Sequence, residues 1–428
     1  MGVVSVVYSA AMKILVVAVG TRGDVQPMAV LSQALLARGH DVTLAASPDQ
    51  GHAVEAMGVP FLACGRDVTA WVAGLNVSMT SLRASLRELR THFETDIKAQ
   101  LPVLVDAARG CDVVVGAALT PWVETLGELT GAQTAYVYYA PGLLRSRRHT
   151  PIGIPVQGLP GPINLLLHTL GLRFIDRVLV PLLTEPRAAF GLPPAAHFTG
   201  VVADDSLLCW DEALAETPDD LVPWLRSHGH DSRLHQVGSL QPAPGAIDDD
   251  TAAFVAAGPT VYVGFGSMPQ RRFEALLTMV QQAALAAGVQ AVLLGGPRRQ
   301  VGPVLVLPQV DHGALFPRLL AVAHHGGAGT TAAAARAGVP QIVVPHFVDQ
   351  PFWALCTQQR GLTAAVIHRQ HLNAGRLARA FIRARDDVEL QKRARAMQVT
   401  LAATDPVRAA VDVVEALGAR GRRGHLSR

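Results

Sequence analysis

A glycine-rich stretch between residues 321 and 354 carries the residues best suited to chemistry. It reads AVAHHGGAGTTAAAARAGVPQIVVPHFVDQPFWA, in which a strand-like run breaks into small residues after His325 and enters an alanine-rich helix near Thr330. The small residues are Gly326, Gly327, Ala328 and Gly329. Glycines let a ligand approach the backbone, and the free amides of a first helical turn, with the helix dipole behind them, favour an anion. The stretch therefore predicts an anion site that suits a diphosphate.

The same stretch predicts a strand–loop–helix–strand unit. The helix is expected to stop at Gly338 and Pro340, and the apolar run QIVVP that follows is typical of a buried parallel strand. Asp349 and Gln350 come just past that strand, so they are predicted to lie at the same rim as the anion site. The alternative is that the glycines only allow close helix packing and that Asp349 is a solvated loop charge.

A second candidate follows the first predicted strand, KILVVAVG (13 to 20). The next residues, TRGDVQP, place Arg22 and Asp24 at the carboxyl end of that strand, before the apolar-periodic helix MAVLSQALLARG, for whose first turn Pro27 is suited. The turn lacks G-x-G-x-x-G spacing, so no dinucleotide cofactor is predicted. Asp24 is either a functional carboxylate or only a helix N-cap or a partner of Arg22.

Strand and helix signals alternate along both halves of the chain and predict an α/β fold, with two facing sheets and a cleft between them. A stretch of linker composition, QPAPGAIDDDTAAF, joins the halves, and its acids Asp248 to Asp250 are interpreted as helix-start charges rather than metal ligands. The second half opens with TVYVGFGSM, a buried strand that ends in Gly264, Gly266 and Ser267. This turn offers amides and a hydroxyl to a phosphate.

Length, composition and charge limit the class of protein. With 428 residues, 50% of them hydrophobic and 17% charged, the chain predicts about two to three globular domains. The net charge of +3, without a basic stripe interleaved with aromatics, gives no reason to predict nucleic-acid binding. The four scattered cysteines predict reduced thiols in the cytoplasm. MGVVSVVYSAA is interpreted as a ragged extension rather than a signal peptide, and no apolar run reaches the about 18 residues of a membrane span.

Residues 143 to 194 differ from the rest because they are rich in Pro and Gly and then amphipathic. They are a mobile lid over an apolar ligand, or an interfacial surface where Arg145, Arg147 and Arg148 meet anionic lipid, or a packed loop and core helix. The residues alone leave these alternatives open.

Four motifs together resemble a known family. GTRGDVQP, VYVGFGSM, HHGGAGTT and VPHFVDQPFWA occur in this order across essentially the whole chain. They look like the family 1 nucleotide-sugar-dependent glycosyltransferases of GT-B fold, in the sterol glucosyltransferase branch, with the vancomycin-group antibiotic glycosyltransferases nearby. The resemblance implies an acceptor-binding Rossmann-like domain (1–240), a linker (241–258), a nucleotide-sugar-binding Rossmann-like domain (259–404), a C-terminal helix that packs back on the first domain (405–418) and a flexible tail (419–428).

The resemblance also implies roles for single residues. Asp24 stands where these enzymes keep the general base that deprotonates the acceptor hydroxyl. Asp349 and Gln350 match the pair that hydrogen-bonds the sugar hydroxyls. For the diphosphate, the resemblance implies His325, Gly327 and Thr330 with their loop neighbours Gly326 and Gly329, and Ser267 approaching from the other loop. Gln309 and Val310 fall in the loop that supports the nucleobase of the donor.

One position departs from the family pattern. Many members have a Glu three residues after the position of Thr330 to hold the ribose, and here Ala333 stands there, so ribose recognition is not assigned. The expected reaction is one direct, inverting displacement, with a base in one domain and an anion hole in the other. An amide-rich helix terminus helped by His325 takes the charge that other glycosyltransferases give to a metal, so neither a metal nor another cofactor is expected.

The sequence therefore predicts an inverting, metal-independent glycosyltransferase. It would move a hexose from a UDP- or dTDP-linked donor to a hydroxyl of a lipophilic acceptor such as a sterol, polyketide or peptide natural product. The alternatives are a nucleotide-sugar epimerase of the same fold and a catalytically silent auxiliary protein that binds nucleotide sugar. We expect a cytoplasmic protein, with peripheral membrane contact as an open alternative. The identity of sugar, nucleotide and acceptor, any charge partner of Asp24, and the oligomeric state are left open.

Overall fold

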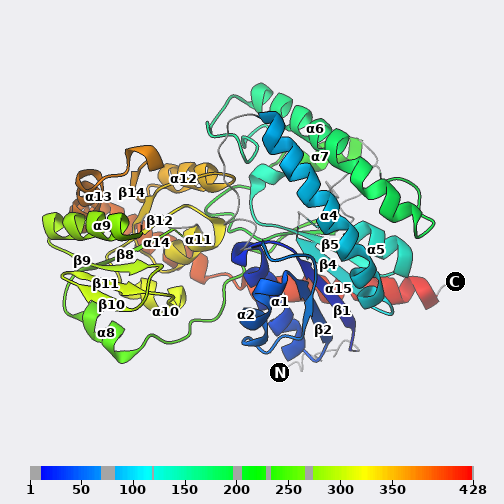
Figure 1. Ribbon diagram of the computed structural model, residues 1–428, viewed down its shortest axis with the longest axis horizontal. Helices are drawn as coiled ribbons and strands as arrows, with labels where there is room; N and C mark the ends of the chain where they lie inside the picture. Colours follow the sequence, from blue (N-terminus) through cyan, green and yellow to red (C-terminus); the bar gives the residue numbers. More distant parts are fainter. Residues whose placement is uncertain are drawn as a thin grey trace, which may run out of the picture.

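Two α/β halves lie side by side in the computed structural model (Figure 1), which describes residues 11–68, 82–117, 120–195, 205–227, 233–265 and 273–426. Within these ranges the first half forms a parallel sheet in the order β3-β2-β1-β4-β5-β6-β7. Its strands are β1 (Lys13–Ala18), β2 (Asp41–Ala46), β3 (Phe61–Ala63), β4 (Val113–Ala117), β5 (Gln133–Tyr138), β6 (Asp205–Leu208) and β7 (Arg233–Gln236).

The second half forms a sheet in the order β10-β11-β9-β8-β12-β13-β14. Its strands are β8 (Thr260–Gly264), β9 (Gln290–Leu294), β10 (Arg299–Val301), β11 (Val304–Leu307), β12 (Ala321–His324), β13 (Gln341–Val343) and β14 (Thr363–Val366). Only the short hairpin strand β10 runs antiparallel in this described sheet. The sequence pattern does not predict β10, because its residues RQV form neither an apolar run nor an alternation of apolar and polar residues.

Helices cover both sheets. Those of the first half are α1 (Arg22–Ala37), α2 (Gly51–Glu55), α4 (Leu82–Ala108), α5 (Val123–Thr130), α6 (Gly161–Ala188) and α7 (Leu221–Ser227), with 3-10 turns at Pro48–Gln50 and Pro141–Leu143. Those of the second half are α8 (Asp249–Ala256), α9 (Phe273–Ala287), α10 (His312–Leu315), α11 (Ala328–Arg336), α12 (Gln350–Gln359), α13 (Ala374–Asp386), α14 (Val388–Ala402) and α15 (Pro406–Leu426), with 3-10 turns at Phe316–Arg318 and Arg369–His371. None of the described helices is long and apolar enough to cross a membrane.

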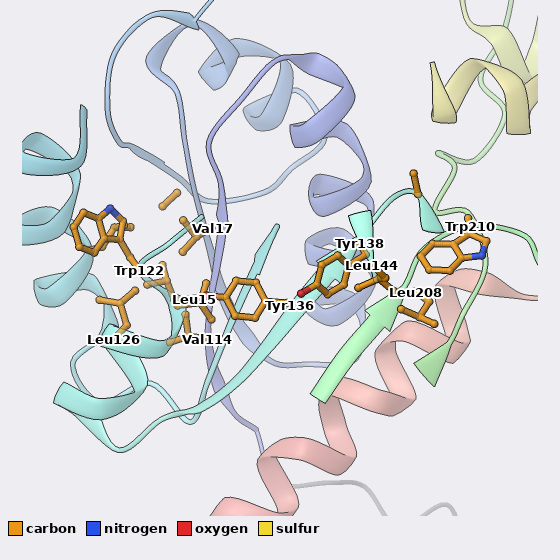
Figure 2. Close-up of a cluster of buried hydrophobic side chains, with 14 of the residues drawn as sticks. Leu15, Val17, Val114, Trp122, Leu126, Tyr136, Tyr138, Leu144, Leu208 and Trp210 are labelled. Carbon is orange, nitrogen blue, oxygen red and sulfur yellow. The ribbon is translucent and has the colours of Figure 1, made fainter. Parts of the chain in front are cut away.

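Continuous apolar strands build the cores because both faces of a parallel sheet are covered. In the first half, side chains from β1, β4, β5 and β6 gather with Trp122 and Trp210 in one buried cluster (Figure 2). The same cluster includes Phe352 and Trp353 of α12 in the second half. The two halves therefore share apolar surface. All four cysteines are buried free thiols.

Helix α1 begins at Arg22, six residues before the predicted Met28, so Pro27 lies inside the helix rather than in its first turn. The cause is local: Asp24 Oδ2 accepts hydrogen bonds from the Thr21 amide (2.9 Å) and the Thr21 hydroxyl (3.0 Å). This pair is a capping box, which satisfies the free amide at a helix start. Thr21, not Asp24, is the N-cap residue.

The C-terminal helix α15 returns to the first half and packs against α1, β4, β5 and β6 (Figure 1). Arg420 Nη2 lies 2.7 Å from Asp205 Oδ2, and His40 Nε2 lies 3.1 Å from Glu415 Oε1. The helix continues to Leu426, so residues 419–426, for which the sequence predicts a flexible tail, are helical. The Arg420–Asp205 contact explains the extension.

The structure bears on the predictions for the acids at the start of α8 and for residues 143–194. Asp248 caps α8 by accepting from the Thr251 amide at 2.9 Å, which confirms its interpretation as a helix-start charge. Within 143–194, α6 is a long helix tied to the preceding loop, since His168 Nε2 lies 3.0 Å from the His149 carbonyl oxygen. On α6 an apolar stripe stays exposed, so the lipid-facing alternative stays a prediction. The stripe consists of Ile163, Leu166, Leu170 and Phe174.

Loops and helices connect the halves. Arg336 at the end of α11 forms an ion pair with Asp211, which is buried in the first half. The Gly153 amide donates to the Val348 carbonyl at 3.0 Å across the junction. These contacts place the carboxyl ends of the two sheets toward each other.

Asp205 generates the first prediction. Its side chain is fully buried and contacts Arg233 (2.9 Å), His235 (2.8 Å) and Arg420. We expect Asp205→Asn to lower the free energy of unfolding by about 2 to 3 kcal/mol in urea titration, because two cations lose their anionic partner. The exposed Asp106→Asn is the control and should change it by less than about 0.5 kcal/mol.

The pH dependence of this difference follows from the pKa of Asp205. Burial opposes ionisation, but hydrogen bonds from His235 and Arg233 and the Arg420 charge hold its pKa below the ordinary 3.8. The carboxylate therefore stabilises the fold fully above the ordinary pKa, and that stabilisation is lost as the pH falls toward the lower folded-state pKa. A difference between wild type and Asp205→Asn that grows on acidification contradicts this account.

Candidate active site

The predicted site residues lie where the strand order of each sheet reverses. β1 is flanked by β2 and β4, and β8 by β9 and β12, so connections leave in opposite directions at the carboxyl ends of these strands. Such switch points open a crevice for ligands in α/β sheets. The Asp24 loop follows β1, and the loop from His325 to Thr330 follows β12. Both predicted loops therefore occupy the position that this fold offers for binding.

Asp24 is half-buried at the start of α1. Burial raises the pKa of its carboxyl above 3.8, although the hydrogen bonds from Thr21 act in the opposite direction. Tyr139, at the end of β5, donates its hydroxyl to the Asp24 carbonyl oxygen at 2.9 Å. A Cβ at Gly20 would lie 2.4 Å from Asp24 Oδ2, so only glycine fits there. The surroundings thus fix the carboxylate and make it a stronger base than a solvated aspartate.

His324 shapes the glycine loop from below. It is fully buried at the end of β12, where its Nδ1 accepts the Gly326 amide (3.0 Å) and its Nε2 lies 2.9 Å from Gln341 Oε1. Gln341 in turn donates to the Thr331 carbonyl at 3.3 Å. Because Nδ1 must accept, the ring is neutral with its proton on Nε2. Burial lowers the pKa of His324 to about 3, which agrees with that state.

The loop then opens into α11 without side-chain capping. Gly327 is the N-cap residue and lacks a capping side chain, and Gly326 has φ +91°, where a Cβ would lie 2.8 Å from Val343 Cγ1. Gly329 is exposed and Thr330 half-buried on the first turn, with no atom within 4 Å of a Cβ at Gly329. The Ala328 amide donates to the Asp349 carboxyl group. No described side chain caps the amides of Gly329 and Thr330, so these two can receive an anion.

His325 lies beside these amides. Its Nδ1 is buried without a hydrogen-bond partner among the described residues, and its Nε2 would lie 2.6 Å from a Cβ at Gly327. Burial, followed by the neighbouring His346 and His312, lowers the pKa of His325 to about 4. At neutral pH it is thus an uncharged hydrogen-bonding group. An arriving phosphate would favour its protonated form.

Asp349 and Gln350 begin α12 at the same rim. Asp349 Oδ2 accepts from Trp353 Nε1 at 3.0 Å, and burial raises the pKa of Asp349 to about 6. Gln350 is buried, and its Oε1 accepts from the His346 and Phe347 amides at 2.8 and 3.2 Å. Only its amide group remains to reach a ligand.

The residue before this pair is strained. Val348 has φ 59°, a left-handed conformation that a β-branched side chain rarely adopts. Its carbonyl oxygen accepts the amide of Gly153 from the other half. The strain therefore coincides with a contact between the halves and with the start of the Asp349 loop.

The remaining predicted residues lie farther along the rim or outside the described ranges. Gln309 is exposed after β11, and Val310 is half-buried against the cluster of α8 and α10. Ala333 packs partly buried on the same cluster. Ser267 lies outside the described residues. Among those described, no group of three or more His, Cys, Asp or Glu side chains is arranged to hold a metal ion.

Electrostatics connects the two halves of the site. The Asp24 charge is among the causes that raise the pKa of Asp349, so the two carboxyl groups lie within electrostatic range. Arg22 similarly helps to lower the pKa of His312, after burial. His312 Nε2 lies 3.1 Å from the hydroxyl of Tyr262, a residue of β8. The structure therefore brings the Asp24 turn to the glycine-loop side of the second half.

Sequence reasoning missed the residues that hold this site in place. Tyr139, His324 and Gln341 look like ordinary strand residues in sequence. The sequence holds only a weak signal for His324. It is the first of two consecutive histidines before a glycine run, and alternation along a strand puts their side chains on opposite sides, so the two face away from each other and one of them points into the core.

His324 generates the second prediction. His324→Leu leaves the Gly326 amide and Gln341 Oε1 without buried partners, so we expect a loss of about 2 to 4 kcal/mol in the free energy of unfolding. Calorimetry should show about tenfold weaker binding of UDP or dTDP, because the loop loses its fixed shape. In His324→Asn, the side-chain oxygen replaces Nδ1 as acceptor and should restore much of the affinity. Equal affinity in wild type and His324→Leu would exclude this role.

Comparisons with known proteins agree with this geometry. Residues 14–121 match the glycosyltransferase family 28 N-terminal domain, and residues 300–417 match the erythromycin biosynthesis protein CIII-like C-terminal domain. Glycosyltransferase GtfE of Amycolatopsis orientalis is 32% identical over 370 residues, which cover 83% of this chain and 86% of that protein. The vancomycin aglycone glucosyltransferase of the same organism is 29% identical over 83% and 86% of the two chains.

A solved structure shares the whole fold. The spinosyn forosaminyltransferase SpnP superposes with a TM-score of 0.70 at 18% identity and covers 96% of this chain and 100% of its own. The two domain matches, the relative at 32% identity and the paired sheets all point to one group of enzymes. The chain belongs to the family 1 glycosyltransferases of GT-B fold, in the antibiotic branch, and is a nucleotide-sugar-dependent glycosyltransferase.

Proposed function

We propose that this enzyme transfers a hexose, with inversion and without a metal ion, from a nucleoside-diphosphate sugar to a hydroxyl group of a lipophilic natural product. The main support is the position of Asp24: a half-buried carboxylate with a raised pKa stands at one switch point, within electrostatic range of the rim that carries Asp349 and the first-turn amides of α11. An attacking oxygen needs a base on one side of the anomeric carbon, and the leaving diphosphate needs an anion site on the other.

In this proposal the second half holds the donor. The α11 amides and Thr330 bind the diphosphate through the loop Gly326 to Gly329, and Ser267 approaches from the β8 loop. His325, neutral in the free enzyme, donates a hydrogen bond to a phosphate oxygen. Asp349 accepts hydrogen bonds from the sugar hydroxyls and the Gln350 amide group donates one, while Gln309 and Val310 lie against the nucleobase.

The first half supplies the base. Asp24 takes the proton of the acceptor hydroxyl while that oxygen forms its bond to the anomeric carbon. The bond from this carbon to the diphosphate oxygen breaks on the opposite face, and the charge of the leaving group passes to the α11 amides. One displacement of this kind inverts the anomeric configuration.

Relatives support the choice of donor and acceptor classes. Glycosyltransferase VinC has been solved with dTDP (TM-score 0.64) and Arabidopsis thaliana UGT89C1 with UDP (TM-score 0.65), at 20% and 14% identity. The relative O-mycaminosyltylonolide 6-deoxyallosyltransferase of Streptomyces fradiae is 29% identical over 94% of this chain. We therefore propose a UDP- or dTDP-linked donor and a polyketide, peptide or sterol acceptor.

The function is tested by incubation with UDP-glucose and dTDP-glucose, with and without a panel of hydroxylated lipophilic acceptors, in excess EDTA. Mass spectrometry should detect an acceptor that has gained a hexose, with the inverted linkage confirmed by NMR. Conversion of the donor without acceptor would instead indicate an epimerase. Binding of the nucleoside diphosphate without any turnover would indicate an auxiliary protein.

Asp24 generates the third prediction. We expect Asp24→Asn to lower kcat by at least about a hundredfold, because an amide cannot accept the proton. The affinity for UDP or dTDP, measured by calorimetry, should stay within about twofold. Asp41→Asn, an exposed change in the same half, is the matched control. Near-normal turnover of Asp24→Asn would rule out its role as base.

The pH profile of kcat/KM generates the fourth prediction. Asp24 and Asp349 act as carboxylates, and each has a raised pKa, that of Asp349 being about 6. A raised pKa means that the carboxylate is lost as the pH falls through that value, so activity should already decline well above pH 3.8. Asp349→Asn should remove one acidic step from the profile. A flat profile down to about pH 4 contradicts both assignments.

A further inference from the structure

A groove runs between β14 and α13 in the second half. It measures about 340 Å³ and is lined on one side by Ala364, Ala365 and Val366 of β14 and on the other by Arg376, Arg379 and Arg383 of α13. His368 and His371, on the turn between the two elements, close one end. β14 is the last strand of its sheet, so the groove follows a free sheet edge.

The three arginines repel one another. Their spacing of three and four residues puts them on one helix face, where like charges destabilise a helix. Arg376 also lies in the first turn of α13, where the positive end of the helix dipole disfavours a cation. No Asp or Glu is among the residues that line the groove. The free protein thus concentrates positive charge at an energetic cost that an anion would relieve.

Within the described ranges, only one of the three arginines has a side-chain partner. Arg383 Nη1 donates to the Ala364 carbonyl at 3.0 Å, and its Nε lies 3.6 Å from Asp387 Oδ2. This bond closes part of the exposed strand edge. Among the described residues, the guanidinium groups of Arg376 and Arg379 have no ion pair or hydrogen bond, so both forks are free to bind a ligand.

The groove is separate from the candidate active site. Helix α13 packs with α9 on one face of the sheet, whereas α11 packs with α14 and α10. In Figure 1, α13 and β14 lie on the side of the second half away from α4 and α6, while α11 and α12 lie toward the first half. None of its lining residues belongs to the loops that carry His325 or Asp349.

We propose that this groove is a second anion site, which binds a small phosphate-bearing solute with two or more negative charges. Planar guanidinium forks match phosphate oxygens in pairs, and Arg376 and Arg379 supply two such forks. The two histidines, whose ring centres are 6.4 Å apart, add donors at the end of the groove. The free edge of β14 gives the ligand a wall without side-chain charge. The site is independent of the glycosyl transfer itself.

Inorganic pyrophosphate is the probe that tests this site. Calorimetry of the full chain at low ionic strength should show two binding events, one at the α11 loop and one in the groove. In the double variant Arg376→Gln/Arg379→Gln we expect the affinity of the groove for pyrophosphate to fall at least tenfold, while the rate of glycosyl transfer is unchanged. Sodium acetate at equal ionic strength should not replace pyrophosphate, because its single carboxylate carries one charge and can pair with only one guanidinium fork.

A matched pair of substitutions separates recognition from net charge. Arg318→Gln/Arg395→Gln removes two exposed arginines of the second half outside the groove and should bind pyrophosphate like the wild type. Thermal unfolding of both double variants checks that they fold. Three results would each overturn the second site. The groove variant could bind pyrophosphate as the wild type does, the control could lose as much affinity as the groove variant, or the wild type could show only the α11 event. The loss of the α11 event alone would count against the donor site and leave the groove intact.

Discussion

The hydrogen bonds from Thr21 to Asp24 Oδ2 determine how the first half enters the site. They start α1 directly after β1, so the carboxylate cannot move away from the end of the sheet. Tyr139 holds the backbone of the same residue from β5, and Gly20 leaves no room for a side chain. A structural role in holding the Thr21 N-cap and the proposed chemical role as base are therefore compatible in Asp24. Thr21 engages one carboxyl oxygen only, and the other remains for a ligand.

The charges of the site come from the backbone rather than from imidazolium groups. His312 and His325 have pKa values lowered to about 4 and His324 to about 3, with burial as the main cause. All three are therefore uncharged at neutral pH. In the proposed donor site, the positive field that faces the diphosphate must then come from the α11 amides, with Arg22 adding to it. The carboxylates of Asp24 and Asp349 at the rim repel an anion. A diphosphate would therefore be held firmly only at the α11 amides.

The sequence was sufficient for the parts of the molecule that depend on local pattern. Buried strands, the glycine loop and the order of the motifs follow from apolar runs and small residues, and they place Asp24 and His325 at strand ends. The features that the sequence did not predict depend on contacts between residues distant in sequence or on side-chain geometry. The extension of α15 depends on Arg420 reaching Asp205, 215 residues away. The start of α1 depends on a capping box, and the shape of the glycine loop on the proton position of His324.

Helix α11 links the proposed anion site to the junction between the halves. Its first turn carries the amides of Gly329 and Thr330, and its last residue, Arg336, forms the ion pair with buried Asp211. Arg336 Nη1 also donates to the Leu401 carbonyl at 3.1 Å, just before the chain crosses back in α15. Because a nine-residue helix is rigid on this scale, a shift of the junction moves the amides as well. The distance between Asp24 and the α11 amides is therefore set by the Arg336–Asp211 contact as much as by the loops that carry them.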